Sequence, residues 1–389
     1  MNALTAPAPH RRLTVAQLIP ALDGGGVERG TLEVSRALVA RGHRSLVMSA
    51  GGRMVDDFVE HGAQHTTLNI GRKSPLTLRQ SLRLRAWCVK QGVDILHPRS
   101  RVPAWVARGA LAGLKGSKRP RLITSVHGLH SVSRYSRVIT TGERVEVVSE
   151  AARRYVLDNY PHTDPAKLVL IPRGVDPAAF AHGHRPAEAW TRAWEQDFPH
   201  LQDRFVIALP GRLTRLKGHH DFLGILERLA TAELPRPAHG LIVGGEDPKR
   251  AAYASELRDA VAQRGLSDQV TFTGHRPDIR DVLASCDACV SLSTKPESFG
   301  RAVLESVALG VPTFGYDHGG VGEVLARVYP SGRIPLGDLD TAAQRLAQLA
   351  TGQVAPPAAD LTVGGMTLQA MLDRTLAMYE DLADAPRQG

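Results

Sequence analysis

The stretch Lys295-Pro296-Glu297-Ser298-Phe299-Gly300-Arg301-Ala302-Val303-Leu304-Glu305 places two carboxylates on either side of a Ser-Phe-Gly turn. Apolar residues at 290–292 predict the end of a buried strand before it, and residues 302–309 predict a helix. A strand, a glycine turn and a helix N-terminus in succession are typical of a site for an anionic or sugar-bearing ligand. Because Glu297 precedes the helix and Glu305 lies about one turn into it, both side chains can project toward one crevice. For two glutamates alone, a solvated loop residue and an ordinary helix residue explain the pattern equally well.

The length and composition indicate a globular protein of two domains. The chain has 389 residues, of which 43% are hydrophobic and 22% charged, and this length fits two domains of roughly 190 residues each. No apolar run approaches the roughly 18–20 residues that span a bilayer, and residues 1–12 lack the apolar segment of a signal peptide. Three cysteines are too few for a disulfide framework, so we expect a cytoplasmic protein.

The charge is unevenly spread along the chain. Residues 1–185 hold 28 Lys and Arg against 13 Asp and Glu, whereas residues 186–389 hold 20 against 26. This asymmetry predicts that the first half meets an anionic surface or substrate. Aromatic residues make up only 5% of the chain and do not alternate with basic ones, which argues against a nucleic acid. Phospholipid or a phosphorylated glycolipid suits the pattern better.

A glycine loop follows the first predicted strand, residues 13–19. The loop, residues 23–30, contains three consecutive glycines and leads into a helix that ends near Arg41. It departs from the dinucleotide fingerprint because Arg29 occupies the third glycine position, and no Gly-Lys-Ser/Thr follows as in a P-loop. A turn with positive φ would require one glycine and not three, so we expect Gly25 and Gly26 to approach a ligand.

Two further features of the first half allow alternative interpretations. Residues 78–90 carry Leu78, Leu82, Ala86 and Val89 on one helical face, which fits a membrane-surface helix or, as we favour, a helix packed on the core. His127 follows the predicted strand 122–126 at the edge where parallel sheets bind ligands. A lone histidine is more often structural, but its position before Gly128 favours a functional role. We interpret the stretch from 177 to 199 as an interdomain linker.

A second alternation of strands and helices begins at residues 205–208. Arg212 and Lys217 straddle the turn that follows, an arrangement that can clamp a diphosphate, although two solvated cations explain it as well. Weaker strand–glycine sites lie at Gly245 and at 274–276. Cys286 and Cys289 have redox spacing, but we interpret them as structural because no second pair exists.

The repeated alternation predicts an α/β fold of two doubly wound Rossmann-like domains facing a cleft. The predicted boundaries are 1–185 for the first domain and 186–389 for the second. A last helix over about 367–385, with Thr367 as its N-cap, is expected to pack back on the first domain.

Several motifs, in order and spacing, resemble glycosyltransferase family 4. They are Gly211-Arg-Leu-x-x-x-Lys217-Gly218, Glu297-Ser-Phe-Gly-x4-Glu305, Gly310-Val-Pro312, Gly319-Gly320-x-x-Glu323, the loop Gly24–Gly26 with Glu28, and Ile171-Pro-Arg-Gly-Val-Asp176. The resemblance extends from Leu13 to about Glu380 and implies a GT-B fold and a transferase that moves a sugar from a nucleotide-sugar with retention of configuration.

The resemblance also implies that the first domain, 1–185, binds the acceptor and the second, 186–389, the donor, and it implies roles for individual residues. Arg212 and Lys217 would neutralise the donor diphosphate in place of a metal, so that no metal or other cofactor is required and the nucleotide-sugar, with UDP expected, is a substrate. Glu297 would hold the sugar hydroxyls and stabilise an oxocarbenium-like transition state, with His127 as a further catalytic-site residue, and Glu305 would hold the ribose. The remaining donor-site residues implied are Gly25, Gly26, Gly245, His275, Arg276, Ser298, Phe299, Gly300 and Leu304.

The acceptor is expected to be anionic and membrane-associated, such as a lipopolysaccharide core or another cell-envelope glycan. Glu28, Arg99 and Arg101 are the predicted acceptor-binding residues, and the protein would be peripheral at the inner face of the cytoplasmic membrane. Two other functions fit parts of the sequence: a non-hydrolysing nucleotide-sugar epimerase and a non-catalytic protein that binds anionic ligands. The paired glutamates and the Arg212/Lys217 turn favour transfer over both.

Overall fold

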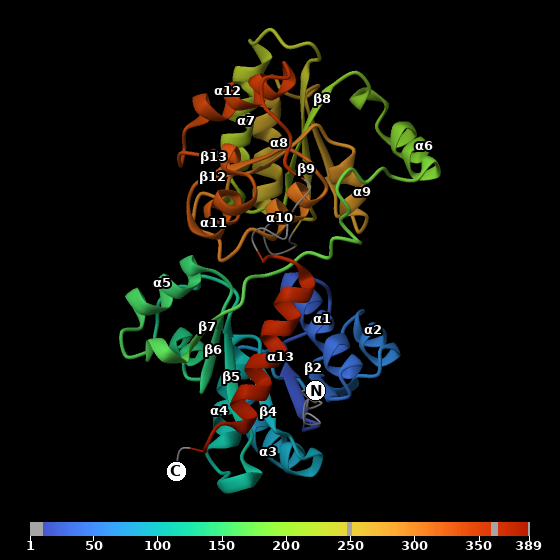
Figure 1. Cartoon of the computed structure of the whole chain (residues 1–389). Helices are drawn as coiled ribbons and strands as arrows, with labels where there is room; N and C mark the ends of the chain where they lie inside the picture. Colours follow the sequence, from blue (N-terminus) through green and yellow to red (C-terminus); the bar gives the residue numbers. More distant parts are fainter. Residues whose placement is uncertain (1–10, 247–250, 359–364, 388–389) are drawn as a thin grey trace, which may run out of the picture. The chain divides into compact units, whose positions relative to one another are not determined.

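The computed structural model describes residues 11–246, 251–358 and 365–387, and these form two compact α/β units (Figure 1). Unit 1 contains the chain up to Val148, then Ala152–Ile171, and again from Met371; unit 2 contains Ser149–Ala151 and Pro172–Ala370. The main division in the chain therefore falls after Ile171, whereas the sequence suggested residue 185.

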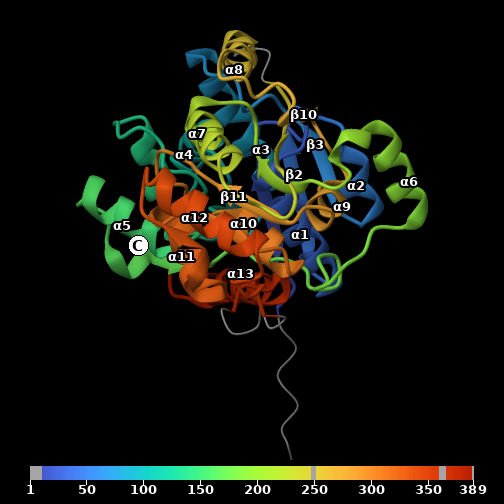
Figure 2. The same cartoon turned by 90° about the horizontal axis from the view of Figure 1, so that it is seen from above.

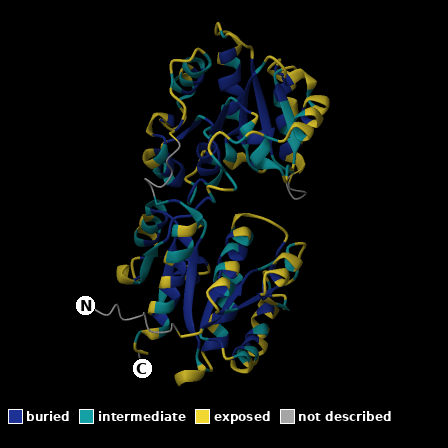
Figure 3. Ribbon diagram, turned by 45° about the vertical axis from the view of Figure 1, so that its right-hand side comes forward, coloured by how far each residue is buried: buried dark blue, intermediate teal, exposed yellow. Residues whose placement is uncertain are grey.

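Unit 1 is built on a seven-stranded parallel sheet in the order β3-β2-β1-β4-β5-β6-β7. Its strands are β1 (Thr14–Leu18), β2 (Arg44–Ser49), β3 (Gln64–Thr67), β4 (Ile95–Pro98), β5 (Arg121–Val126), β6 (Arg144–Val147) and β7 (Leu168–Leu170). The helices are α1 (Gly26–Ala40), α2 (Val55–Glu60), α3 (Gln80–Gln91), α4 (Arg101–Leu111), α5 (Glu150–Asn159) and α13 (Leu368–Asp384). The central strands are buried on both faces, as parallel strands covered by helices usually are, and they are dark blue in Figure 3.

Unit 2 repeats this plan with a six-stranded parallel sheet in the order β10-β9-β8-β11-β12-β13. Its strands are β8 (Phe205–Pro210), β9 (Ala238–Val243), β10 (Val270–Gly274), β11 (Ala288–Ser291), β12 (Thr313–Tyr316) and β13 (Arg333–Ile334). The helices are α6 (Glu188–Asp197), α7 (His219–Ala230), α8 (Ala251–Gln263), α9 (Ile279–Ala284), α10 (Arg301–Ala308), α11 (Gly319–Val328) and α12 (Leu339–Ala350). Figure 2 shows α10, α11 and α12 gathered together in orange.

Both sheets reverse their strand order once, and this positions the candidate site. The reversal lies between β1 and β4 in unit 1 and between β8 and β11 in unit 2. In open α/β sheets, ligands bind outside the carboxyl ends of the strands at such a switch point. The loops that follow β8 and β11 are those that carry Lys217 and Glu297.

The last helix, α13, packs on unit 1. The Thr367 hydroxyl caps it by accepting a hydrogen bond from the Ala370 N–H at 3.2 Å. Buried Tyr379 lies 2.8 Å through its hydroxyl from His97 Nδ1 on β4. The Arg121 guanidinium on β5 donates to the Ala385 carbonyl at 2.7 Å. The C-terminal half of α13 and the residue that follows it are thus attached to this sheet, far from their neighbours in the sequence.

The stretch from 177 to 199 is more than the linker that the sequence suggested. It contains α6, whose residue Trp194 is buried in a cluster with Val282 and Leu283 of α9. Figures 1 and 2 both show α6 beside α9. Burial of a tryptophan supplies much of the energy that orders a short helix, so this segment belongs to unit 2.

The helix α3 and the turn before it also differ from the sequence interpretation. Leu84 and Cys88 face the core, but Leu78, Leu82 and Val89 have exposed fractions of 48%, 65% and 43%. The apolar face that we expected to pack on the core is therefore in solvent. None of the described helices combines the length and apolar character that a bilayer-spanning segment needs.

Candidate active site

An ion pair joins two loops at the switch point of unit 2. The loop after β8 includes a short 3-10 turn, Arg215–Lys217, and the loop after β11 leads to α10. The Thr294 N–H donates to the Leu216 carbonyl at 2.9 Å, which fastens one loop to the other. Beside this contact, Lys217 Nζ lies 2.7 Å from Glu297 Oε1. The structure thus brings together two residues that the sequence singled out separately.

Glu297 is half-buried and held by more than Lys217. The Ser293 hydroxyl donates to the same carboxylate oxygen, and His318 Nε2 donates to the Ser293 carbonyl at 2.6 Å. Burial by itself would raise the pKa of Glu297, but the charge and hydrogen bond of Lys217 and the hydrogen bond of Ser293 outweigh it, so this pKa lies below its usual value. Glu297 is therefore a carboxylate at neutral pH.

The turn that carries Glu297 is fixed by α11. The Gly320 N–H donates to the Glu297 carbonyl at 2.8 Å. A Cβ at position 320 would lie 2.3 Å from Phe299 Cα, so only glycine permits this approach. Phe299 itself is buried, and Gly300 caps α10 with a φ of +101°. The Gly319-Gly320 motif therefore supports the Ser298-Phe299-Gly300 turn from behind.

Arg212 is a second cation in the loop after β8, the loop that also carries Lys217. It is exposed, and its side chain has no hydrogen bond or ion pair with any described residue. An exposed guanidinium at the carboxyl end of a parallel strand is available for an anionic ligand. Together with Lys217 it gives the loop two cations close to the switch point.

Glu305 and Leu304 on α10 behave differently from each other. The Glu305 side chain is 9% exposed and accepts a hydrogen bond from Arg301 Nε at 2.8 Å. The side chain of Leu304, in contrast, is buried in unit 2, and its predicted donor contact stays a prediction.

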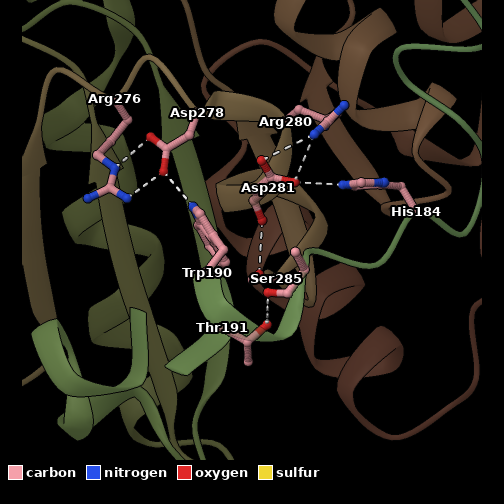
Figure 4. Close-up of polar contacts among 9 residues, drawn as sticks. His184, Trp190, Thr191, Arg276, Asp278, Arg280, Asp281 and Ser285 are labelled. Carbon is pink, nitrogen blue, oxygen red and sulfur yellow. Dashed lines mark hydrogen bonds and ion pairs between the residues drawn. The ribbon is translucent and has the colours of Figure 1, made fainter. Parts of the chain in front are cut away.

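The residues predicted at the ends of β9 and β10 also differ in their surroundings. Gly245 and His275 lie close together, since a Cβ on the glycine would be 3.3 Å from the His275 Cβ, and His275 is exposed. Arg276 is instead committed to Asp278, to which its Nε and Nη2 donate at 2.9 and 2.6 Å (Figure 4). It also lies over the Trp194 ring, so Arg276 fastens α6 to the β10–α9 connection.

In unit 1, the predicted residues after β1 and β5 lie at the carboxyl edge of the sheet. Gly25 and Gly26 are exposed at the start of α1, and the Glu28 carboxylate folds back against Gly25. A Cβ on Gly26 would meet nothing within 4 Å, so local packing does not require glycine there. His127 directly follows β5 and is half-buried.

The two arginines predicted to bind the acceptor have different surroundings. Arg99 is 2% exposed, and its Nη1 lies 3.6 Å from the buried Glu146 carboxylate. It is therefore inside the unit and not on its surface, because β4 carries it beneath the edge of the sheet. Arg101 begins α4, lies over the Tyr135 ring and donates to the Ser136 hydroxyl at 3.2 Å.

Three residues of the site were missed by sequence reasoning. Ser293 and His318 support Glu297, and Arg301 pairs with Glu305. Ser293 lies shortly before the quoted motif, Arg301 lies within it, and His318 immediately precedes the Gly319-Gly320 pair, so proximity to the motifs was a signal for all three. The contacts that these residues make in the folded structure could not be read from the sequence.

The described residues contain no group of three or more His, Cys, Asp or Glu side chains that could hold a metal ion. Cys286 and Cys289 are buried thiols, and burial raises the pKa of Cys289 to about 12. Thiols with so high a pKa are poor nucleophiles and poor metal ligands. Both fit the structural role that their position before and within β11 suggested.

Two family models match the chain, one on each half. Residues 24–179 match Glycosyltransferase Family 4, and residues 191–353 match Glycosyl transferases group 1. A solved glycosyltransferase from Rickettsia africae has a TM-score of 0.81 at 24% identity and covers 97% of this chain and 100% of that one. The Anabaena protein HepE in complex with UDP and glucose has a TM-score of 0.75 at 18% identity, with coverage of 94% and 99%.

Curated relatives carry several acceptor names. The 2-deoxystreptamine N-acetyl-D-glucosaminyltransferase of Streptomyces fradiae is 33% identical over 35% of this chain and 31% of its own length. The N-acetyl-alpha-D-glucosaminyl L-malate synthase of Bacillus anthracis is 22% identical over 85% of both chains. The chain spans between 31% and 52% of the length of the first four curated relatives. The matches to both models place the chain in glycosyltransferase family 4, with the GT-B fold of two Rossmann-like units.

Proposed function

We propose that this protein transfers a sugar from a nucleoside diphosphate sugar, with UDP as the nucleotide, to an anionic acceptor of the cell envelope, with retention of configuration. The observation that carries the proposal is the Lys217–Glu297 ion pair at the switch point of unit 2, with exposed Arg212 in the same loop. A family 4 glycosyltransferase needs a cationic site for a diphosphate and an anionic site for a sugar, and these three residues supply both.

The cations act on the leaving group. In the reaction, the bond between the anomeric carbon and the β-phosphate oxygen breaks, and negative charge develops on that oxygen. Arg212 and Lys217 neutralise this charge where it develops, which is the kind of electrostatic stabilisation that lowers such barriers most. With two cations present, the reaction needs no metal ion.

Glu297 acts on the sugar as a carboxylate. Because its pKa is lowered, it has no proton to donate at neutral pH and cannot be a general acid. It can accept hydrogen bonds from sugar hydroxyls and stabilise the positive charge that an oxocarbenium-like transition state carries. The acceptor oxygen then bonds to the anomeric carbon on the face that the phosphate leaves, and its proton goes to the departing phosphate.

Glu305 fits the ribose of the nucleotide. It is nearly buried and ionically paired with Arg301, which lets it accept hydroxyl hydrogen bonds without bearing an uncompensated charge. UDP is the expected nucleotide, and the similar fold of HepE, solved with UDP and glucose, agrees with this choice.

The acceptor is assigned from charge. The excess of 28 basic over 13 acidic residues lies in the first 185 residues, most of which form unit 1. A lipid-linked or lipopolysaccharide-type glycan carries the phosphate or carboxylate groups that such a surface attracts. A similar fold belongs to a lipopolysaccharide outer core galactosyltransferase. A small soluble anion is the second candidate, because one relative is named as an L-malate synthase.

The test has two stages. In the first, UDP and UDP-sugars are screened by thermal shift with and without EDTA, and we expect Tm to rise with UDP in both conditions. In the second, the sugar that shifts Tm most is supplied with phosphorylated glycan acceptors and with L-malate, and the product linkage is assigned by NMR. Retained configuration is expected. Inverted linkage, loss of transfer with EDTA, or isomerisation of the UDP-sugar without any acceptor would overturn the proposal.

A further inference from the structure

A pocket of about 570 Å³ opens at the carboxyl edge of the unit 1 sheet. Its walls come from the segments that follow β3, β4 and β5, which is the same edge that carries Gly25 and His127. The volume lies within the range of roughly 300–1,000 Å³ that small-ligand sites occupy. Of the residues that the sequence singled out for the site, Arg101 lines this pocket, and the donor-site residues of unit 2 do not.

The inner wall of the pocket is apolar and held in place. Pro75, Leu78, Val102, Trp105 and Tyr135 line it. The indole N–H of Trp105 donates to the Tyr135 carbonyl at 3.0 Å, which joins α4 to the loop after β5. A wall already fixed by such contacts loses little entropy when a ligand enters. An apolar chain would find this surface ready to bind.

The residues that line the pocket include three cations and no carboxylate. Arg72 and Lys73 are exposed, and neither side chain has a hydrogen bond or ion pair with a described residue. The third cation, Arg101, lies over the Tyr135 ring at 5.4 Å from its centroid. Burial, and then the charges of Arg101 and Lys73, lower the pKa of nearby His130 to about 4. This histidine is therefore neutral at pH 7 and does not add to the positive charge at the pocket.

The turn that carries Leu78 is also ordered by its own hydrogen bonds. The Thr77 hydroxyl donates to the Arg72 carbonyl at 2.8 Å, and the Ser74 hydroxyl accepts from the Leu76 N–H at 3.3 Å. These bonds keep Leu78 at the pocket although its exposed fraction is 48%.

We propose that this pocket holds the apolar chain of an anionic lipid phosphate, with the phosphate on Arg72, Lys73 and Arg101. The inference rests on the proposed function and names its acceptor class: a saccharide or polyol linked through phosphate to a lipid. The chain would lie against Leu78, Val102 and Trp105, and the polar end of the acceptor would stay at the carboxyl edge of the sheet, where Gly25 and His127 lie.

The proposal is tested with dodecyl phosphate below its micelle concentration, in the absence of any nucleotide. Binding is followed by calorimetry and by the fluorescence of Trp105 and the other tryptophans. Inorganic phosphate and dodecyl maltoside are titrated in parallel. We expect dodecyl phosphate to bind at least about tenfold more tightly than either, because only it combines a chain with an anion.

Matched variants assign the binding to the pocket. Leu78→Glu and the double variant Arg72→Ala/Lys73→Ala should each weaken dodecyl phosphate about tenfold. Leu82→Glu and Arg83→Ala are the controls, since both residues are exposed on α3, directly after the turn that carries Leu78, but do not line the pocket. The controls should bind as the unaltered protein does. All five positions are exposed, so the variants are expected to fold.

Several results would overturn the proposal. Equal weakening by Leu82→Glu and Leu78→Glu would assign the lipid to a broad surface, such as one that docks on a bilayer. Inorganic phosphate binding as tightly would indicate a site for the free ion, and dodecyl maltoside binding as tightly would remove the role of the cations. The UDP thermal shift is measured on the unaltered protein and on every variant. If the unaltered protein shows this shift but does not bind dodecyl phosphate, the pocket assignment is wrong and the donor-site proposal stands.

Discussion

Lys217 and Glu297 form an ion pair of 2.7 Å between loops that follow two adjacent parallel strands, β8 and β11, although 80 positions separate them in the chain. In this structure the Lys217 ammonium and the Glu297 carboxylate bind each other, and these are the two groups that the proposed ligand would bind. A diphosphate that binds Lys217 competes with Glu297 for the ammonium, and the carboxylate then becomes available to sugar hydroxyls. Under the proposed function, the pair would therefore couple binding of the leaving group to exposure of the carboxylate that holds the sugar.

Replacing Glu297 by Gln should separate binding from turnover. The variant leaves Lys217 without a competing negative charge, so UDP should bind as tightly as in the unaltered protein or more tightly. Transfer should fall about 10²-fold or more, because the charge that stabilises the transition state is gone. Steady-state kinetics and UDP calorimetry measure the two effects separately.

Glu256→Gln is the matched control for that variant. Glu256 is an exposed carboxylate of α8 in the same unit, and it pairs with Arg215 and not with Lys217. Its loss should leave kcat and KM within about twofold of the starting values, as is usual for exposed pairs. Unchanged transfer in Glu297→Gln would refute the role given to Glu297.

Arg212→Ala should weaken UDP about tenfold, because a guanidinium bound to phosphate contributes roughly 1.5–3 kcal/mol. Arg215→Ala is the control: this arginine belongs to the same loop, but its guanidinium is already paired with Glu256. Calorimetry with UDP and with uridine distinguishes the diphosphate contact from other effects. If both arginine variants weaken UDP equally, the loop contributes general charge and Arg212 has no specific contact.

The ion pair should contribute to stability in a pH-dependent way. The pKa of Glu297 is lowered from its ordinary value of 4.5. A carboxyl group whose pKa falls on folding stabilises the protein above its unfolded pKa, and this contribution is lost as pH falls through the folded value. The unaltered protein should be more stable than Glu297→Gln by roughly 1 kcal/mol in the free energy of unfolding at about pH 7. The corresponding difference in Tm should shrink below about pH 4.5. A constant difference down to about pH 3 would show that the pair is not ionised as described.

Sequence reasoning predicted the repeated pattern of strands and helices well, and the site in part. Continuous apolar runs such as residues 13–19 identify buried parallel strands without any tertiary information. The strand ends then locate the loops, and so Arg212, Lys217 and Glu297 could be found before the structure was known. The pairing of Lys217 with Glu297 could not, because it depends on β8 and β11 being neighbours in space.

The sequence did not reveal contacts that come from distant segments. Arg276 stays a predicted donor-site residue, but its side chain is paired with Asp278 and lies over the Trp194 ring of α6, which the sequence did not indicate. Arg99 follows a strand as a binding residue would, yet Glu146 of the next strand but one holds it inside. For α3, the apolar face was identified correctly and its partner was assumed, since periodicity does not reveal which face meets the core.

Gly320→Ala should disturb the turn that positions Glu297. The added Cβ would lie 2.3 Å from Phe299 Cα and 2.4 Å from Phe299 N, both backbone atoms that cannot rotate away. We expect a loss of about 1–3 kcal/mol in the free energy of unfolding and a larger loss of transfer than of UDP binding. Gly224→Ala on α7 is the control, because its nearest contact is the mobile end of the Leu339 side chain. Full activity of Gly320→Ala would mean that the turn shifts without consequence for Glu297.

Tyr379→Phe should loosen α13 from unit 1. The Tyr379 hydroxyl is buried against His97 Nδ1 at 2.8 Å, and its removal leaves a buried imidazole nitrogen without that partner. The cost should be about 1–2 kcal/mol, measured by urea unfolding. The rate of amide hydrogen exchange in α13 should increase more in this variant than the rate in β8 and β9 of unit 2, because the contact belongs to unit 1 alone. Arg374→Gln, at an exposed position of the same helix, should change neither quantity; equal effects of the two variants would indicate that helix propensity and not the His97 contact holds α13 in place.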